Sequence, residues 1–418
     1  MSDKSRRVVI TGLGVVSAYG DGVEVFWENL VNGVSGIKPI TIIPTDDQAV
    51  KFGGEYTDFN PELYIDKKEI RRMDRYSQLG LVAAILAAKD ANLDVSQTDA
   101  TRVGVIVGSA SGGINTIQHN HKVIIDRGPS KCSPFTVPMM IVDMAAGLIS
   151  KHLGAKGPNK AVVTACASAA HSIGDAFRSI VYGDADVMIT GGCEASLNTL
   201  SMAGFSSART LSTRNDEPTK ASRPFDKDRN GFVMAEGAGI IIMETLEHAQ
   251  KRGAKIYAEV VGYGASGDAY DMVAPCPDGE GAARAMQIAL NDAGLKPEDV
   301  TYVNAHGTST SVGDVAETTA IKTVFGDYAK NGLLVSSTKS MTGHMLGAAG
   351  GIEAAACAKV VETGIVPPTI NLDNPDEKCD LDYVAHKARN VGKVNAVMSN
   401  SFGFGGHNAS LIFKKFEA

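Results

Sequence analysis

Two hydrophobic patterns alternate along the chain. Short runs of β-branched and other apolar residues are followed by alanine-rich stretches in which apolar positions recur every three or four residues. The first pattern predicts buried strands and the second predicts amphipathic helices, so their alternation favours an α/β protein packed in layers. The clearest expected strands in the first part are residues 103–107, 161–164 and 186–190. Between the last two, residues 167–182 have helical periodicity and end at Gly183, a typical helix stop.

A comparable order of elements returns after residue 255. The expected elements are strands at 256–262, 301–304 and 334–337 and helices at 281–293 and directly after residue 344. The repeat lies in the order of elements and not in a literal sequence period. We therefore expect two duplicated halves, residues 1–255 and residues 256–418.

The N-terminal apolar run, residues 8–18, follows basic residues much as the core of a signal peptide does. Gly12 and Gly14 interrupt it, and its first residues are β-branched, so we interpret it as a buried first strand. No apolar stretch approaches the roughly 20 residues of a membrane span. Membrane insertion is therefore not expected.

Composition narrows the possible partners. The chain has 418 residues, 44% of them hydrophobic, and a formal net charge of −7, which argues against a general nucleic-acid binder. An acidic partner would have to meet a local basic patch. The six cysteines are scattered without a CxxC pair, so neither a zinc site nor a disulfide framework is expected, and a cytoplasmic location fits best.

Cys166 is the first candidate for chemistry. Residues 162–171 read VVTACASAAH, which predicts a buried strand that turns into a helix at the cysteine. A thiol at a helix N-terminus has a lowered pKa, because the helix dipole favours the thiolate. The alternative, a small buried hydrophobe, is equally open on this segment alone. Cys193 follows a strand but opens no comparable helix, so its claim is weaker.

Two histidines follow expected strands in the second half. His306 lies in residues 304–310, NAHGTST, and His344 ends residues 336–344, SSTKSMTGH. Active sites form where strand ends meet loops, so we expect Cys166 and both histidines to converge. Two imidazoles can stabilise one developing oxyanion, such as an enolate. Lys339 is either a surface residue or buried, with Glu317 as a plausible counter-ion.

A glycine-rich turn follows an expected strand end near the C-terminus. Residues 398–408 read MSNSFGFGGHN, and the turn carries Phe402 and Phe404. Such glycines either make a tight turn or let a backbone N–H point at a substrate oxygen, and a phenylalanine beside them could close an apolar tunnel. The segment lacks the spacing of a phosphate-binding loop.

Taken together, these motifs resemble the β-ketoacyl-ACP synthases, and among them the synthase II type. The resemblance covers essentially the whole chain. The motifs that carry it, in the family's order, are residues 164–166, 211–215, 222–226, 304–310, 339–344 and 400–406. It implies a thiolase-like fold of two duplicated halves in a five-layered α-β-α-β-α arrangement, a homodimer, and acyl carrier protein as partner. It implies no cofactor, because substrates arrive on the carrier's phosphopantetheine arm.

The resemblance also implies a reaction. Cys166 would take the acyl group from acyl-ACP, and His306 and His344 would stabilise the enolate that forms as malonyl-ACP loses carbon dioxide. The carbanion would then attack the thioester. Backbone N–H groups of Cys166 and Phe404 would form the oxyanion hole, and Phe404 would also act as the gate of the acyl pocket.

Further positions are assigned by the same resemblance. Lys339, paired with Glu317, would organise the site. Thr308 and Thr310 match positions that hydrogen-bond the phosphopantetheine arm, and Phe402 lies beside the gate.

A basic docking patch for the acidic carrier protein is implied at Arg71, Arg72 and Arg209, with Lys67 or Lys68. Ordinary solvated charge is nearly as good an interpretation for each of these residues. No metal is required by the reaction, although a monovalent cation site seen in some family members is matched by Asn304, Glu353, Ser399 and Asn400.

Two positions depart from the family's pattern. Ser111 stands where synthase II often has isoleucine in the segment that lines the acyl pocket, which predicts room for longer acyl chains. His407 replaces a common threonine after the glycine turn, which affects local loop contacts and leaves Cys166, His306 and His344 intact.

Other members and relatives of the fold fit less well. A thiolase would need a second cysteine near the C-terminal glycine loop, where this chain has Phe404. Chalcone-synthase-like and synthase III enzymes have asparagine where this chain has His344, and a Cys-His hydrolase needs neither two histidine loops nor an acyl gate. A non-catalytic chain-length factor would have lost Cys166. Preferred chain length, use of unsaturated substrates, and fatty-acid against polyketide synthesis stay open.

Overall fold

Ten strands follow one another along a single path of hydrogen-bonded neighbours. The computed structural model describes residues 6–417, so the outermost residues of the two expected halves, 1–5 and 418, lie outside it. The path runs in the order β11-β10-β14-β15-β9-β1-β8-β7-β5-β6. Its strands are β1 (Val8–Ser17), β5 (Val103–Gly108), β6 (Asn159–Val162), β7 (Val187–Glu194), β8 (Gly237–Thr245), β9 (Ala258–Gly267), β10 (Val300–Asn304), β11 (Leu334–Ser336), β14 (Ala396–Gly403) and β15 (His407–Lys414).

The path consists of two half-sheets with one topology. In the first, β1 is antiparallel to β8 and β8 to β7, whereas β7, β5 and β6 are parallel. In the second, β9 is antiparallel to β15 and β15 to β14, whereas β14, β10 and β11 are parallel. Within residues 6–417, the half-sheets pair only between Val8–Ile10 of β1 and Ala258–Val260 of β9. The duplicated order expected from the sequence is therefore present in the sheet.

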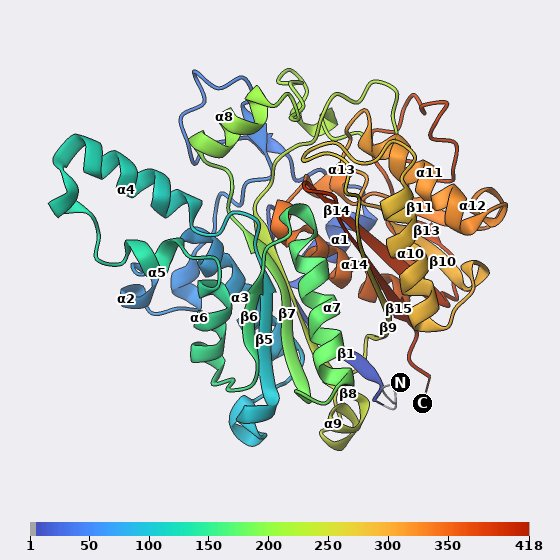
Figure 1. Ribbon diagram of the computed structural model, residues 1–418, viewed down its shortest axis with the longest axis horizontal. Helices are drawn as coiled ribbons and strands as arrows, with labels where there is room; N and C mark the ends of the chain where they lie inside the picture. Colours follow the sequence, from blue (N-terminus) through green and yellow to red (C-terminus); the bar gives the residue numbers. More distant parts are fainter. Residues whose placement is uncertain (1–5, 418) are drawn as a thin grey trace.

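Helices form three layers around the half-sheets (Figure 1). Helices α3 and α6 cover the outer face of the first half-sheet, α10 and α11 lie outside the second, and α7 and α14 pack between them. Their bounds are α3 (Arg75–Asp90), α6 (Met144–Leu153), α7 (Ser168–Val181), α10 (Glu280–Ala293), α11 (Gly313–Phe325) and α14 (Ala349–Thr363). This is the five-layered thiolase-like arrangement that the resemblance implied.

Glycines allow a helix to lie directly on a strand at equivalent places in the two halves. A Cβ added to Gly14 of β1 would lie 2.0 Å from the carbonyl oxygen of Ala83 in α3. A Cβ added to Gly264 of β9 would lie 2.0 Å from the carbonyl oxygen of Ala285 in α10. Only a residue without a side chain permits this backbone approach.

One expected strand differs from the structure in its surroundings. Residues 161–164 were expected to form a buried strand, but β6 ends at Val162 and is the outermost strand of its half-sheet, with partly or fully exposed residues. Among the described residues, its only strand neighbour is β5. The hydrophobic pattern of a segment depends on its apolar residues alone. It therefore cannot distinguish an edge strand such as β6 from a central strand.

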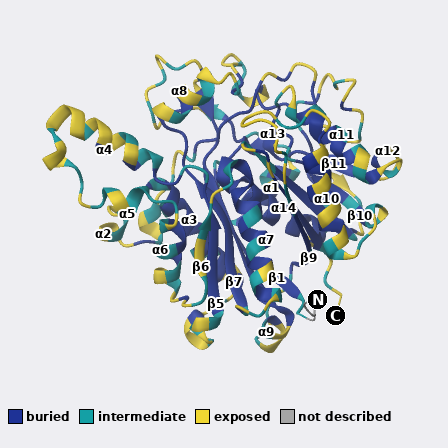
Figure 2. Ribbon diagram, viewed as in Figure 1, coloured by how far each residue is buried: buried dark blue, intermediate teal, exposed yellow. Residues whose placement is uncertain are grey.

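An arm projects from the body beside β6. It contains α4 (Ile114–Arg127) and α5 (Thr136–Met140), and Figures 1 and 2 show it extending away from the layers as largely exposed ribbon. Large apolar side chains on it are solvent-exposed, including Ile125 at 69% and Val137 at 60%. Among residues 6–417, no helix is both long and apolar enough to cross a membrane.

The strand-to-helix contact at Gly14 predicts a large effect of one methyl group. Gly14→Ala should lower the free energy of unfolding by about 3 kcal/mol, because backbone atoms of α3 must move. Gly204→Ala in α8 (Thr199–Ser207) is the matched control, since its Cβ would meet no atom within 4 Å. That control should gain about 0.5–1 kcal/mol from the lost flexibility of glycine. Urea unfolding measures both, and equal stability of the two variants would contradict the packing argument.

Candidate active site

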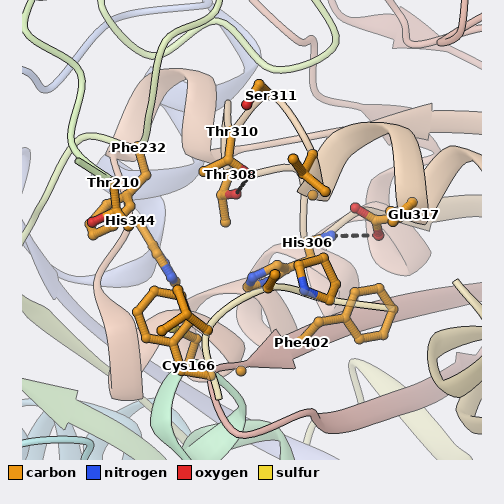
Figure 3. Close-up of a pocket in the computed structure, with 18 of the residues that line it drawn as sticks. Cys166, Thr210, Phe232, His306, Thr308, Thr310, Ser311, Glu317, His344 and Phe402 are labelled. Carbon is orange, nitrogen blue, oxygen red and sulfur yellow. Dashed lines mark hydrogen bonds between the residues drawn. The ribbon is translucent and has the colours of Figure 1, made fainter. Parts of the chain in front are cut away.

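A cavity of about 260 Å³ opens between the two halves, where strand ends meet the central helices. Figure 3 shows Cys166, His306 and His344 pointing into it from three separate segments. The sequence-predicted residues that line it are Cys166, His306, Thr308, Thr310, Glu317, His344, Phe402, Phe404 and Arg209. Residues far apart in the chain thus meet at one hollow.

Cys166 stands on a sharp turn before α7. Ala165 has a positive φ of 49°, residues Ala165–Ala167 form a 3₁₀ turn, and α7 begins at Ser168. The Ser168 hydroxyl secures the turn by accepting the Thr164 N–H at 2.9 Å and donating to the Ala165 carbonyl at 2.7 Å. The strained turn lifts the thiol toward the cavity at the N-terminal end of the helix.

The resting thiol is protonated, contrary to the sequence-based expectation. Burial raises the pKa of the Cys166 thiol to about 12, and the charge of Glu194 adds to this effect. The nearby Lys339 charge and the backbone N–H groups of Phe404 and Cys166 favour the thiolate but do not outweigh burial. The helix end favours the thiolate, but Cys166 is only 8% exposed, and this desolvation depends on packing that a local motif does not report.

The two histidines are neutral and face each other. Their ring centroids are 5.4 Å apart and the rings are nearly perpendicular, at 86°. Burial and the Lys339 charge hold the pKa of both rings well below the ordinary value for histidine. Both ring nitrogens of His344 and Nδ1 of His306 are buried without a hydrogen-bond partner within the described chain. Both rings line the cavity, and burial leaves these three nitrogens unsatisfied.

Lys339 is buried, and its ion-pair partner differs from the one predicted. Its ammonium pairs with Glu353 of α14 and not with Glu317; both members of the pair are at most 2% exposed. Glu317 instead accepts the N–H groups of His306 and Gly307, each at 2.8 Å. The prediction was wrong because Glu317 lies on α11, directly after the His306 loop. Its carboxylate therefore binds the N–H groups of that loop and does not pair with Lys339.

The two carboxylates near Lys339, Glu353 and Glu317, have raised pKa values. Burial raises the pKa of Glu353 and of Glu317 to about 7, and the Lys339 charge works against both shifts. Asn400 also donates its amide to Glu317 at 3.3 Å. Glu317 borders the cavity with its carboxylate bound to the N–H groups of the His306 loop, and Glu353 is paired with Lys339.

Other predicted site residues lie at the mouth or walls. The hydroxyls of Thr308 and Thr310 bond each other at 3.1 Å (Figure 3). Phe402 lies 5.7 Å from the His306 ring, and Phe404 lies 6.2 Å from the ring of Phe205, both measured between ring centroids. Aromatic side chains thus cover the cavity from the glycine turn and from α8.

Several predicted residues lie elsewhere. Ser111 does not line this cavity; its N–H binds Glu194 and its hydroxyl accepts from Ser196 at 3.2 Å. Arg71 lines a second hollow at the foot of the α4 arm, and Arg72 stacks on Phe135 of that arm. Only Arg209 of the predicted docking residues lines the main cavity.

Sequence reasoning missed Glu194 and Phe232. Glu194 ends β7 fully buried, and it binds the N–H groups of Ala110 at 2.7 Å and of Gly347 at 3.2 Å. It therefore joins the segment before the arm to the segment after His344. The Phe232 ring packs against His344 at 5.4 Å. An acidic residue at the end of a buried strand was a usable signal for Glu194, whereas nothing local marked Phe232.

Family comparison covers nearly the whole chain. Residues 5–249 match the family model described as "Beta-ketoacyl synthase, N-terminal domain", and residues 257–373 match "Beta-ketoacyl synthase, C-terminal domain". A protein of Staphylococcus aureus (strain COL) named "3-oxoacyl-[acyl-carrier-protein] synthase 2" is 56% identical over 415 residues, which cover 99% of this chain and 100% of the relative.

Solved structures agree with this assignment. The ishigamide ketosynthase/chain length factor is similar with a TM-score of 0.93 and 36% identity, over 99% of this chain and 100% of the other. A ketosynthase bound to the hexaketide, in complex with its type II PKS acyl-carrier protein, is similar with a TM-score of 0.91 and 36% identity, over the same shares of the two chains.

The observed partner of Lys339 can be tested by double-mutant cycles. Combining Lys339→Met with Glu353→Gln should reveal a coupling of about 3 kcal/mol in urea unfolding, because either single change leaves a buried charge unpaired. The matched cycle with Glu317→Gln should give less than about 1 kcal/mol, since that carboxylate binds backbone N–H groups. A larger coupling to Glu317 would restore the pairing expected from the sequence.

Proposed function

Because the chain belongs to the β-ketoacyl synthase family, we propose that the cavity around Cys166 carries out its condensing reaction, with Cys166, His306 and His344 as the catalytic residues. The protein is a 3-oxoacyl-ACP synthase of fatty-acid synthesis, which condenses malonyl-ACP with a cysteine-bound acyl chain. The observation that carries the assignment of residues is the meeting of a buried thiol, on a strained turn at Ala165, with two neutral imidazoles, three of whose ring nitrogens lack partners within the described residues.

In the first half-reaction, Cys166 accepts the acyl group. Sγ attacks the thioester carbon of acyl-ACP, the carbonyl oxygen becomes an oxyanion, and the carrier's thiol leaves with the proton given up by Cys166. The N–H groups of Cys166 and Phe404 stabilise this oxyanion. This role is supported by their position, since both N–H groups hydrogen-bond the thiol region and lower the pKa of Cys166.

In the second half-reaction, malonyl-ACP loses carbon dioxide. The electrons of the broken C–C bond move into the thioester carbonyl, and N–H groups of His306 and His344 stabilise the resulting enolate oxygen. Neutral imidazoles suit this role, because each carries one N–H to donate. The enolate carbon then attacks the acyl-Cys166 thioester and releases β-ketoacyl-ACP and the free cysteine.

Lys339 and the two threonines complete the assignment. Lys339, paired with Glu353, organises the charges around the histidines, and Glu317 holds the His306 loop. Thr308 and Thr310 bind the phosphopantetheine arm of the carrier, and Phe404, with Phe402 beside it, gates the acyl pocket. No cofactor is needed by this chemistry, since the carrier delivers both substrates.

Separate half-reactions test these roles. The wild-type protein with acyl-ACP and malonyl-ACP should give β-ketoacyl-ACP and carbon dioxide. Cys166→Ala should form no acyl-enzyme by intact mass. His306→Ala and His344→Ala should still be acylated but decarboxylate malonyl-ACP about 10²–10³-fold more slowly, because one oxyanion donor is lost.

His152→Ala, an exposed position on α6, is the control and should keep wild-type rates. Absence of β-ketoacyl-ACP from folded wild-type protein would refute the function. Histidine variants that decarboxylate normally would refute the roles of His306 and His344 alone.

We also propose a homodimer that forms along β6. The edge of β6 has no strand neighbour within residues 6–417, and Val163 beside it is 53% exposed. The adjacent α4 arm exposes Ile125 and Val137. Unpaired edges and exposed apolar side chains of this kind are covered in stable proteins, and a second copy would cover both.

Three further assignments complete the proposal. The halves divide at residues 1–255 and 256–418, supported by the repeated strand order. A cytoplasmic location is supported by six cysteines that are all free. A monovalent cation could be held by Asn304, Glu353, Ser399 and Asn400, supported by the buried, unpartnered Oδ1 of Asn304 and Oε2 of Glu353.

Carrier-protein docking is proposed at Arg71, Arg72 and Arg209. An acidic carrier needs a basic patch on a protein whose net charge is −7. Support is strongest for Arg209, which lies at the cavity itself. The solved ketosynthase in complex with an acyl-carrier protein supports a partner of this kind.

Ser111 is proposed, on the family resemblance alone, to lengthen the acyl pocket beyond the described cavity, which it does not line. Ser111→Ile should shorten the longest acyl-ACP that is elongated, because the branched side chain occupies space that the serine leaves free. A series of acyl-ACP chain lengths measures the cutoff, and Ser150→Ala on α6 serves as a control with wild-type preference. A common cutoff for Ser111→Ile and the wild type would rule out this role.

A further inference from the structure

The segment from Thr308 to Ser311 forms one wall of the cavity without belonging to a helix or strand. It lies in the connection between β10 and α11; Thr308 and Ser309 are buried, Thr310 is half-buried and Ser311 is exposed. Figure 3 shows Thr308 and Thr310 turned toward each other above His306. Such a connection needs outside contacts to hold one conformation.

The backbone of this segment is strained at Ser309. Its φ is +70°, a region that non-glycine residues rarely adopt. The fully buried Ser309 is held by three neighbours: its N–H donates to Asp314 at 3.2 Å, its hydroxyl accepts the N–H of Arg223 at 3.0 Å, and its carbonyl accepts the N–H of Gly231 at 3.0 Å. The strained backbone conformation persists because these three contacts hold Ser309 in place.

Arg229 binds the next two carbonyls with one edge of its guanidinium. Nε donates to the Thr310 carbonyl at 2.9 Å, and Nη2 donates to the Ser311 carbonyl at 2.8 Å. On the other edge, Nη1 donates to the Asp226 carbonyl at 2.7 Å and to the Asp376 carboxylate at 2.8 Å. The side chain is only 3% exposed, so its charge is fully committed inside the protein.

Arg229 does not line the cavity, so its effect on substrates must pass through the segment that it holds. A guanidinium presents its donors in a rigid plane, which fixes two consecutive carbonyls at once, whereas a lysine ammonium is a single point charge. With both carbonyls held from behind, the hydroxyls of Thr308 and Thr310 are kept on the cavity side.

We propose that Arg229 is a positioning residue for the phosphopantetheine arm: it sets the placement of the Thr308 and Thr310 hydroxyls by holding the Thr310 and Ser311 carbonyls. This inference rests on the proposed role of the two threonines in binding the arm. The segment that carries Arg229 also contains residues 222–226, a motif for which the condensing chemistry has no direct use.

Arg229→Lys tests the proposal because it keeps the positive charge but removes the paired guanidinium donors that bind the two carbonyls. The KM for malonyl-ACP and for acyl-ACP should rise about tenfold, since misplacement of a positioned group costs one to two powers of ten, while kcat stays within about threefold. Alkylation of Cys166 by iodoacetamide, which needs no arm, should stay within about twofold of wild type. Protection of Cys166 by S-methylpantetheine, an unreactive thioether, should weaken about tenfold.

Arg223→Lys is the matched control. Arg223 is an equally buried arginine of the same segment, but its side chain pairs with Asp226 and Asp373 and binds no carbonyl of the cavity wall. Its backbone N–H contact to Ser309 survives the substitution. Both KM values of this variant should stay within about twofold of wild type.

A cycle with Thr308→Val/Thr310→Val separates positioning from general stability. In that background, Arg229→Lys should change the two KM values by less than about twofold, because the hydroxyls it would misplace are gone. If Arg229→Lys is poorly folded, Asp376→Ala, which removes one partner of Nη1, should raise both KM values in the same direction by a smaller factor.

Equal KM effects of Arg229→Lys with and without the threonine hydroxyls would overturn the proposal. So would unchanged protection by S-methylpantetheine, or parallel losses in Arg223→Lys and Arg229→Lys. Protection is measured without turnover, so it still tests the placement of the arm if wild-type protein forms no β-ketoacyl-ACP, which would be a failure of the proposed function.

Discussion

The charge of a single buried cation, Lys339, acts on every catalytic group in the cavity, beside the larger effect of burial. The Lys339 charge favours the thiolate of Cys166, disfavours protonation of His306 and His344, and lowers the pKa of both Glu317 and Glu353 against the effect of burial. A charge in so dry a place persists only with a partner, and Glu353 supplies it. The Lys339 charge thereby adds to burial in keeping the two imidazoles neutral, a state in which each ring has one N–H to donate to an enolate.

The layered fold brings these groups together from distant parts of the chain. The central layer of α7 and α14 carries the Cys166 turn on one side and Glu353 on the other, between two half-sheets of the same topology. The second half-sheet delivers His306 at the end of β10 and Lys339 just after β11. Duplication thus places the nucleophile Cys166 on one half, and His306 and Lys339 on the other.

Rigidity around the cavity comes from polar contacts behind its walls. Glu194 joins the segment before the α4 arm to the segment after His344 through their N–H groups. Arg229 binds the carbonyls of Thr310 and Ser311 in the wall segment. Both are buried charged groups whose hydrogen bonds go largely to backbone atoms. Backbone contacts of this kind fix the path of a loop whatever its own side chains are.

Local patterns predicted the elements well. The sequence alone determined the strand and helix order, its duplication, and the presence of Cys166, His306 and His344 at the starts or ends of elements, because these follow from periodicity and short-range chemistry. Resemblance of the motifs then identified the family and its fold. Boundaries moved by a few residues, as for the strand expected at 161–164, since hydrogen bonds to a neighbour decide where a strand ends.

Only the tertiary structure decided the electrostatics. The sequence placed Cys166 at a helix end and predicted a low pKa, but burial, which depends on every packed neighbour, raises it. It paired Lys339 with the wrong glutamate, because the choice between Glu317 and Glu353 depends on how α11 and α14 pack. Glu194 and Arg229 act on segments far away in the chain, and long-range contacts of this kind leave no local pattern to read.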